Sequence, residues 1–311
     1  MKKVQFSHKN FIKSYHYYSF PLGILASNQN LYKNWILGKF INIFCGEVLQ
    51  YDEKYYGEWD IFEEKIYKNL YLYDKREISN FLKNGILNNY AIHLWEINEK
   101  YIPNSIAYNR FDYKHDILII GYDNLSKLIK IVSTDRTRNL VESDISLELI
   151  NKSFTNNTSG RIFKIKEGIL PNVNDNEIIS NIREYICPNN KNKIKYYDNT
   201  LNHKKDLISG IYALDKFASI LKNKIYTKNY INSIILINEH KKNLFYNLNH
   251  LHKRKIIDKI LIDKYKEIVK LSNILKYQYI KFILKPNREL ELSLIKNLIE
   301  IIEIENKILS I

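Results

Sequence analysis

His115 and Asp135 are the residues of this sequence best placed for acid–base chemistry. His115 begins an apolar segment that ends in Gly121, and the next apolar segment, after a turn, ends in Ser133-Thr134-Asp135. In an antiparallel hairpin the start of the first strand lies beside the end of the second, so both side chains are expected at one rim of a sheet. A carboxylate beside an imidazole orients the ring, as a general base requires. The sequence therefore predicts that His115 is a general base and that Asp135 orients it.

Two observations bear on this prediction. Asp116 is nearer to His115 in the sequence, but successive residues of a strand point to opposite faces, which makes Asp116 the poorer partner. A lone histidine at a strand start is more often structural, and that is the competing interpretation of His115. The aspartate across the hairpin is what favours the chemical role.

The hairpin belongs to a first half that mixes strand and helix patterns. Branched and aromatic residues predict strands, and apolar residues at spacings of three and four predict helices. A helix is also expected to begin at Ser19, because serine is a favourable N-cap and Pro21 is tolerated in the first turn. The expected strands are 90–97, 115–121 and 128–132, and the other expected helices are 75–82 (closed near Gly85) and 144–154. The apolar segment 32–44 is compatible with a buried helix or a strand, and a helix is favoured.

The second half changes from strand to helix. A strand at 161–166 and a helix at 174–186 come first, and from residue 204 onward apolar residues recur at helical spacing. The expected helices cover 207–221, 231–251, 256–284 and, after Pro286, 288–311. The fold class is thus α+β: a catalytic domain with a small antiparallel sheet at 1–155, a connecting segment at 156–203 and a helical bundle at 204–311.

The hairpin sequence also resembles a known family. The string His-x-x-x-x-x-Gly-Tyr-Asp from His115 to Asp123, followed by a second strand and Asp135, resembles papain-like cysteine peptidase domains of the bacteriocin-processing type. It is more closely similar to the butirosin-biosynthesis BtrH N-terminal-like acyltransferases and to amide-forming enzymes of polythioamide assembly. The resemblance covers about residues 15–155 and implies a papain-like domain. It also implies a triad of a cysteine at the start of the first long helix, the strand histidine and the following aspartate.

The sequence departs from this family at the nucleophile. Ser19 occupies the place of the family's cysteine. A helix N-terminus lowers the pKa of a thiol, whereas a serine hydroxyl is far less acidic and needs a stronger base. Three interpretations remain: a Cys→Ser replacement that removes activity, a serine acyltransferase, or a scaffold used for binding. Cys45 is the rival nucleophile, although a free cysteine in an apolar segment is usually buried and inert.

The charge of the chain bears on its partners. With 48 Lys and Arg against 34 Asp and Glu among 311 residues, the formal net charge is +14, although an AT-rich coding sequence alone would enrich lysine. An acidic acyl or peptidyl carrier protein fits this charge as the thioester donor, and a small amine, a peptide or water fits as the acceptor. The first alternative is an inactive papain-like protein that binds a carrier protein or peptide. The second is a nucleic-acid-binding protein with interleaved Lys and Tyr at 195–197 and 276–279; it is disfavoured because no known motif is present.

Several other classes are disfavoured by what the sequence lacks. There is no apolar run of about 18 residues and no signal-peptide pattern, so no membrane partner is expected and a cytoplasmic location is predicted. Two cysteines do not suffice for a disulfide framework or a cysteine-rich metal site. No glycine-rich phosphate loop or metalloprotease motif occurs, so neither a cofactor nor a metal is predicted.

Overall fold

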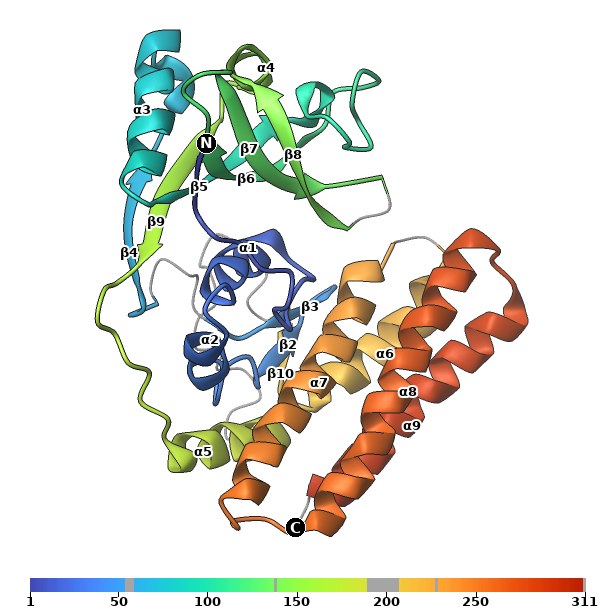
Figure 1. The fold of residues 1–311 in the computed structure, drawn as a ribbon. Coiled ribbons are helices and arrows are strands. Elements are labelled where there is room, and N and C mark those ends of the chain that lie inside the picture. The colour runs from blue at the N-terminus through green and yellow to red at the C-terminus, as the bar shows by residue number, and fades with distance from the viewer. Residues whose placement is uncertain (54–58, 137–138, 189–206, 227–228, 310–311) are drawn as a thin grey trace. The chain divides into compact units, whose positions relative to one another are not determined.

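The chain folds into two compact units, each assembled from segments that are far apart in the sequence. The computed structural model in Figure 1 describes residues 1–53, 59–136, 139–188, 207–226 and 229–309. The first unit comprises Met1–Asn10, Phe20–Tyr32 and Tyr56–Leu170, and the second comprises Phe11–Ser19, Lys33–Tyr55 and Pro171–Ile311. This division corrects the predicted boundaries, because residues before 55 contribute to both units. Residues 189–203 of the predicted connecting segment, and 204–206 of the predicted bundle, lie outside the described residues.

The first unit contains an antiparallel sheet of seven strands. The path of neighbouring strands is β4 (Phe62–Tyr67), β9 (Ser159–Ile165), β5 (Ala91–Asn98), β6 (Lys114–Tyr122), β7 (Leu128–Thr134) and β8 (Leu140–Ser146), and β1 (Lys2–Lys3) pairs with β6. The predicted strands at 90–97, 115–121 and 128–132 are confirmed. The strand predicted at 161–166 exists as β9, but it pairs with β4 and β5 inside the sheet and does not lie in a connecting segment.

Helices cover one face of this sheet. From α3 (Lys75–Leu87) and α4 (Leu147–Ser153), apolar side chains pack on isoleucines and leucines of β5, β6 and β7. The sequence predicts that α3 closes near Gly85, but the helix continues to Leu87. Gly85 serves packing instead, because a Cβ there would lie 2.9 Å from Cδ1 of Ile92 on β5. The helix expected at 144–154 is correct only in part, since 140–146 form β8 against β7 and Ser146 then caps α4.

The helix α1 (His16–Leu25) begins earlier than the sequence predicted. The N–H of Ser19 donates to the carbonyl of Tyr15 at 2.8 Å, so Ser19 is the fourth residue of the helix and not its N-cap. Burial explains the extension, because Tyr18 is 3% exposed and packs edge-on against Phe40, with ring centroids 5.1 Å apart. This contact depends on the tertiary structure, which local capping preferences do not predict.

The helix predicted at 32–44 is also shorter than expected. Its helical part is α2 (Gln29–Trp35), after which Gly38 and Phe40 adopt positive φ values of 78° and 56°. These backbone conformations end the helix, and the chain continues into β2 (Ile43–Cys45). The apolar character of the segment therefore reflects burial in two different elements.

The second unit is mainly helical, as predicted for the C-terminal part of the chain. It contains a small sheet of β10 (Ile208–Ser209), β2 and β3 (Leu49–Tyr51). Its helices are α5 (Asp175–Ile186), α6 (Tyr212–Lys224), α7 (Ile231–Lys253), α8 (Lys259–Leu284) and α9 (Arg288–Leu309). Helix α8 packs against both α7 and α9, and α6 packs against α9. None of the helices within the described residues is both long and apolar enough to cross a membrane.

A buried polar network joins four helices of this unit. Nζ of Lys241 on α7 lies 2.5 Å from Oε2 of Glu305 on α9, and both side chains are fully buried. The hydroxyl groups of Tyr185 on α5 and Tyr265 on α8 donate hydrogen bonds to the same carboxylate, at 2.8 Å and 2.5 Å. Because each charged group has a hydrogen-bonding partner, the network offsets part of the cost of removing the ion pair from water.

Candidate functional site

The predicted pair of His115 and Asp135 belongs to the antiparallel hairpin of β6 and β7. Leu118 pairs with Val132 across this hairpin; His115 lies at the start of β6, and Asp135 directly follows the end of β7. The carboxylate of Asp135 accepts a hydrogen bond from the backbone N–H of Asn139 at 2.9 Å, in the turn that leads to β8. Both residues therefore lie at one rim of the sheet of the first unit.

The carboxylate bonded to the His115 ring is that of Glu99, which is not among the predicted site residues. Its Oε1 lies 3.0 Å from Nδ1 of His115, and the side chains of Glu99 and His115 are 2% and 32% exposed. Glu99 begins a short 3-10 turn (Glu99–Tyr101) directly after β5, and the side chain of Asn98 caps that turn. The contact arises because β5 pairs with β6 and Ile97, two residues before Glu99, lies opposite His115.

The environment of His115 favours a charged imidazole. Burial alone lowers the pKa of the His115 ring, but the hydrogen bond and charge of Glu99, with a further contribution from Asp116, raise it above the ordinary value of 6.5. The ring of Tyr113 stacks on the imidazole, with centroids 5.5 Å apart and planes inclined by 26°. These contacts hold the ring in one orientation.

Asp116 points to the opposite face of the sheet from His115, as the sequence predicted. Its Oδ2 lies 3.2 Å from Nε2 of His93 on β5, so the unit holds a second histidine–carboxylate pair. His115 shares its face with Ile97 and Ile117, which belong to the core under α3 and α4. On the other face, the ring of Phe20 packs edge-on against His93, with centroids 5.3 Å apart.

The two predicted nucleophiles are both buried. Ser19 is 0% exposed and lies in the second unit, whereas Phe20, the next residue of α1, belongs to the first and packs on the face of the sheet opposite His115. Cys45 on β2 is also 0% exposed, and burial raises the pKa of its thiol to about 12, although the charge of Lys216 opposes this. A thiol with such a pKa stays protonated near neutral pH, which disfavours Cys45 as a nucleophile.

The structure also bears on the nucleic-acid alternative. Of the two segments with interleaved Lys and Tyr, 195–197 lies outside the described residues. In the other, Tyr277 is exposed, but Tyr279 is 1% exposed and its hydroxyl accepts a hydrogen bond from the N–H of Tyr230 at 2.7 Å. A buried ring offers no face on which a base could stack.

Comparison with known proteins leaves the function to be inferred from this geometry. The sequence matches no protein-family model and no curated protein. Among the residues that the structure describes, no three His, Cys, Asp or Glu side chains are grouped so that they could hold a metal ion. The pairing of His115 with Glu99 is the arrangement from which a chemical role can be argued.

Proposed function

We propose that this protein is a papain-like acyl-transfer enzyme in which His115 is the general base and Glu99 positions it. The reaction would move an acyl group from a carrier-protein thioester to an amine or to water, as in the biosynthesis of peptide natural products. The observation that carries the proposal is the 3.0 Å contact between a buried carboxylate and a partly exposed imidazole. It occurs at the rim of an antiparallel sheet, at the position of the histidine in the family motif.

The geometry supports a base that uses Nε2. The Nδ1–H group of His115 donates a hydrogen bond to Glu99, and this bond selects the neutral tautomer whose lone pair is on Nε2. When Nε2 takes a proton from the attacking group, the buried charge of Glu99 stabilises the imidazolium that forms. Asp135, which directly follows β7 at the same rim of the sheet, is proposed as a second carboxylate of the site.

The route of acyl transfer depends on the attacking group. The family resemblance implies attack by Ser19 and a covalent acyl-enzyme. The burial of Ser19, and the packing of Phe20 on the face opposite His115, favour direct attack by the acceptor amine or water. Replacing Ser19 by alanine separates the two routes: turnover persists if attack is direct, and both turnover and acyl-enzyme disappear if Ser19 is the nucleophile.

The proposal is tested by thiol release from an acyl-loaded, acidic carrier protein. His115→Ala should lower the rate at least roughly 100-fold, the usual range for loss of a general base. The control is His8→Ala, because His8 is exposed and lies in the same unit; this variant should keep the wild-type rate. Full activity in His115→Ala would show that the base has been wrongly assigned. If His93→Gln then lost activity, the pair of His93 and Asp116 would take its place.

A second candidate is a binding protein on the same scaffold. It is favoured by a buried serine at the position where the family has a reactive cysteine. A folded protein that binds the carrier protein, with an affinity that falls as salt screens its +14 charge, yet cleaves no thioester would support this alternative.

A further inference from the structure

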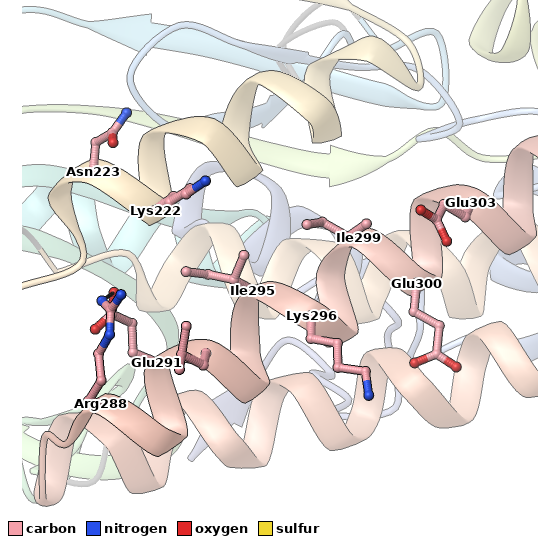
Figure 2. A pocket seen from close by; sticks show the side chains of 10 residues that line it. Lys222, Asn223, Arg288, Glu291, Ile295, Lys296, Ile299, Glu300 and Glu303 are labelled. Atoms are coloured by element: carbon pink, nitrogen blue, oxygen red, sulfur yellow. Dashed lines mark hydrogen bonds and ion pairs between the residues drawn. The ribbon is translucent and has the colours of Figure 1, made fainter.

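A groove between α6 and α9 of the second unit has an apolar centre and charged ends. It holds about 810 Å³ and runs along residues 288–303 of α9 (Figure 2). Leu292 and Ile299 line it and are 53% and 43% exposed, which is unusual for large apolar side chains that recur on one face of a helix. The groove is therefore a candidate surface for association.

The exposed residues of α9 form one continuous stripe. Leu292, Lys296, Ile299 and Glu303 are all exposed, and their spacings of four, three and four residues keep them on the same side of the helix. The buried face of α9 carries Leu294, Leu298 and Ile301 among others. Two turns of apolar surface thus remain outside the core of the unit.

The charges of the groove are separated along its length. Lys222 of α6 and Arg288 of α9 lie toward one end, Glu300 and Glu303 lie at the other, and Lys296 lies between them (Figure 2). Arg288 also pairs with the buried Glu291 of its own helix, whose carboxylate accepts a further hydrogen bond from Tyr226. The groove is consequently basic at the start of α9 and acidic toward its end.

We propose that the occupant of this groove is the same groove of a second copy of the chain, with the two α9 helices antiparallel. A two-fold axis between Ile295 and Lys296 would place Leu292 of one copy opposite Ile299 of the other, and Arg288 opposite Glu303. It would also bury Leu292 and Ile299 of both copies. Such an interface is isologous, so one surface must complement itself, and opposite charges at the two ends of an apolar stripe meet that requirement. A strongly acidic partner would meet repulsion from Glu300 and Glu303.

The test uses sedimentation velocity over a range of protein concentrations. The wild-type mass should rise from 37.3 kDa toward twice that value as concentration increases. Two double variants, Leu292→Glu with Ile299→Glu and Leu292→Lys with Ile299→Lys, should each remain monomeric because like charges face each other. An equimolar mixture of the two variants should recover the dimer through opposite charges. The control is Leu284→Glu, because Leu284 is 81% exposed on α8 and does not line the groove.

Each outcome decides the proposal. All these substitutions are at exposed positions, and circular dichroism with a thermal melt shows whether each variant is folded. A wild-type protein that stays monomeric up to its solubility limit would overturn the proposal, as would double variants that dimerise like the wild type. A different result would assign the groove to an acidic carrier protein instead. In that case the wild-type protein stays monomeric and binds the carrier protein, the glutamate variant loses this binding, and the lysine variant keeps it.

Discussion

At the scale of single residues, His115 and Glu99 determine the proposed chemistry. The carboxylate of Glu99 raises the pKa of His115 against the opposing effect of burial. Only the neutral ring acts as a base, so the rate of acyl transfer should rise with pH through this raised pKa. The same pairing adds stability that is fully present below the unfolded-state pKa of histidine and is lost as pH rises through the folded-state pKa.

Replacing Glu99 by glutamine should shift the titration of His115. Loss of the carboxylate charge removes the largest effect that raises the pKa, so the pH at half-maximal rate should move to lower values while the maximal rate falls. The chemical shifts of the imidazole, followed by NMR across the same pH range, should move in parallel and report the pKa without reference to activity. Asp116→Asn should cause a smaller shift in the same direction. An unchanged titration in Glu99→Gln would contradict the assigned pairing.

Glu239 provides a second residue-scale prediction, in the second unit. Its carboxylate accepts the backbone N–H groups of Lys13 and Ser14 at 2.8 Å and 3.1 Å, and burial raises its pKa to about 7 despite these hydrogen bonds. Since the folded protein holds this proton more tightly than the unfolded chain, stability should fall between about pH 4.5 and pH 7, by about 3 kcal/mol in total. Urea unfolding of Glu239→Gln should lack this slope. The control Glu289→Gln, at an exposed carboxylate, should keep it, and a slope retained by Glu239→Gln would rule out Glu239 as its source.

At the scale of elements, a local sequence signal sets the start of helix α3. Helix α3 begins with a capping box, in which the side chain of Asp74 accepts from the N–H groups of Arg76 and Glu77 and the side chain of Glu77 accepts from the N–H of Asp74. These hydrogen bonds satisfy orphan donors of the first turn. The helix start at residue 75 is therefore set by residues adjacent in sequence.

Removing this cap should destabilise the first unit measurably. Asp74→Ala leaves two N–H groups without their acceptor and should lower the free energy of unfolding by about 1 kcal/mol. Chemical denaturation followed by far-UV circular dichroism measures the change. Asp60→Ala, at an exposed aspartate outside any helix, should have little effect. Equal losses in the two variants would show that the box adds no stability.

At the scale of the whole molecule, the second unit depends on segments from the start of the chain. Buried polar side chains of α7 are satisfied there: Nδ2 of Asn243 donates to the carbonyl of Lys39 at 2.7 Å, and Oδ1 of Asn247 accepts from the N–H of Gly38 at 2.7 Å. Nε2 of His240 lies 2.7 Å from the carbonyl of Ile41, and burial holds the pKa of this ring well below its usual value. The neutral ring of His240 therefore donates a hydrogen bond from Nε2 to that carbonyl.

A fragment of residues 204–311, the bundle that the sequence delimits, should consequently fold poorly. Without residues 11–55, the side chains of Glu239, His240, Asn243 and Asn247 lose their partners, and leaving a buried polar group unsatisfied costs roughly 1–3 kcal/mol each. The fragment is expected to keep helical far-UV circular dichroism but to lose near-UV signal and cooperative unfolding. The full-length chain is the reference. A fragment that unfolds as cooperatively as the full chain would contradict the division into discontinuous units.

The sequence by itself determined the elements whose signals are local. Alternating and branched residues indicated β5, β6 and β7, the turn between β6 and β7 set the hairpin that holds His115 and Asp135, and helical periodicity indicated α7, α8 and α9. Each of these features depends on residues within one or two turns or one hairpin. Periodicity reports which face of an element is apolar, and that is enough to predict the element.

Only the tertiary structure decided which distant groups meet. Glu99 reaches His115 through the pairing of β5 with β6, Tyr18 extends α1 because its ring is buried, and Gly85 lies within α3 because Ile92 approaches it closely. The interleaved segments of the two units have the same origin, since residues 11–19 and 33–55 pack with helices that begin after residue 170. Apolar patterns carry no record of which buried surface an element will face, so these partnerships are decided by packing and hydrogen bonding between segments distant in the sequence.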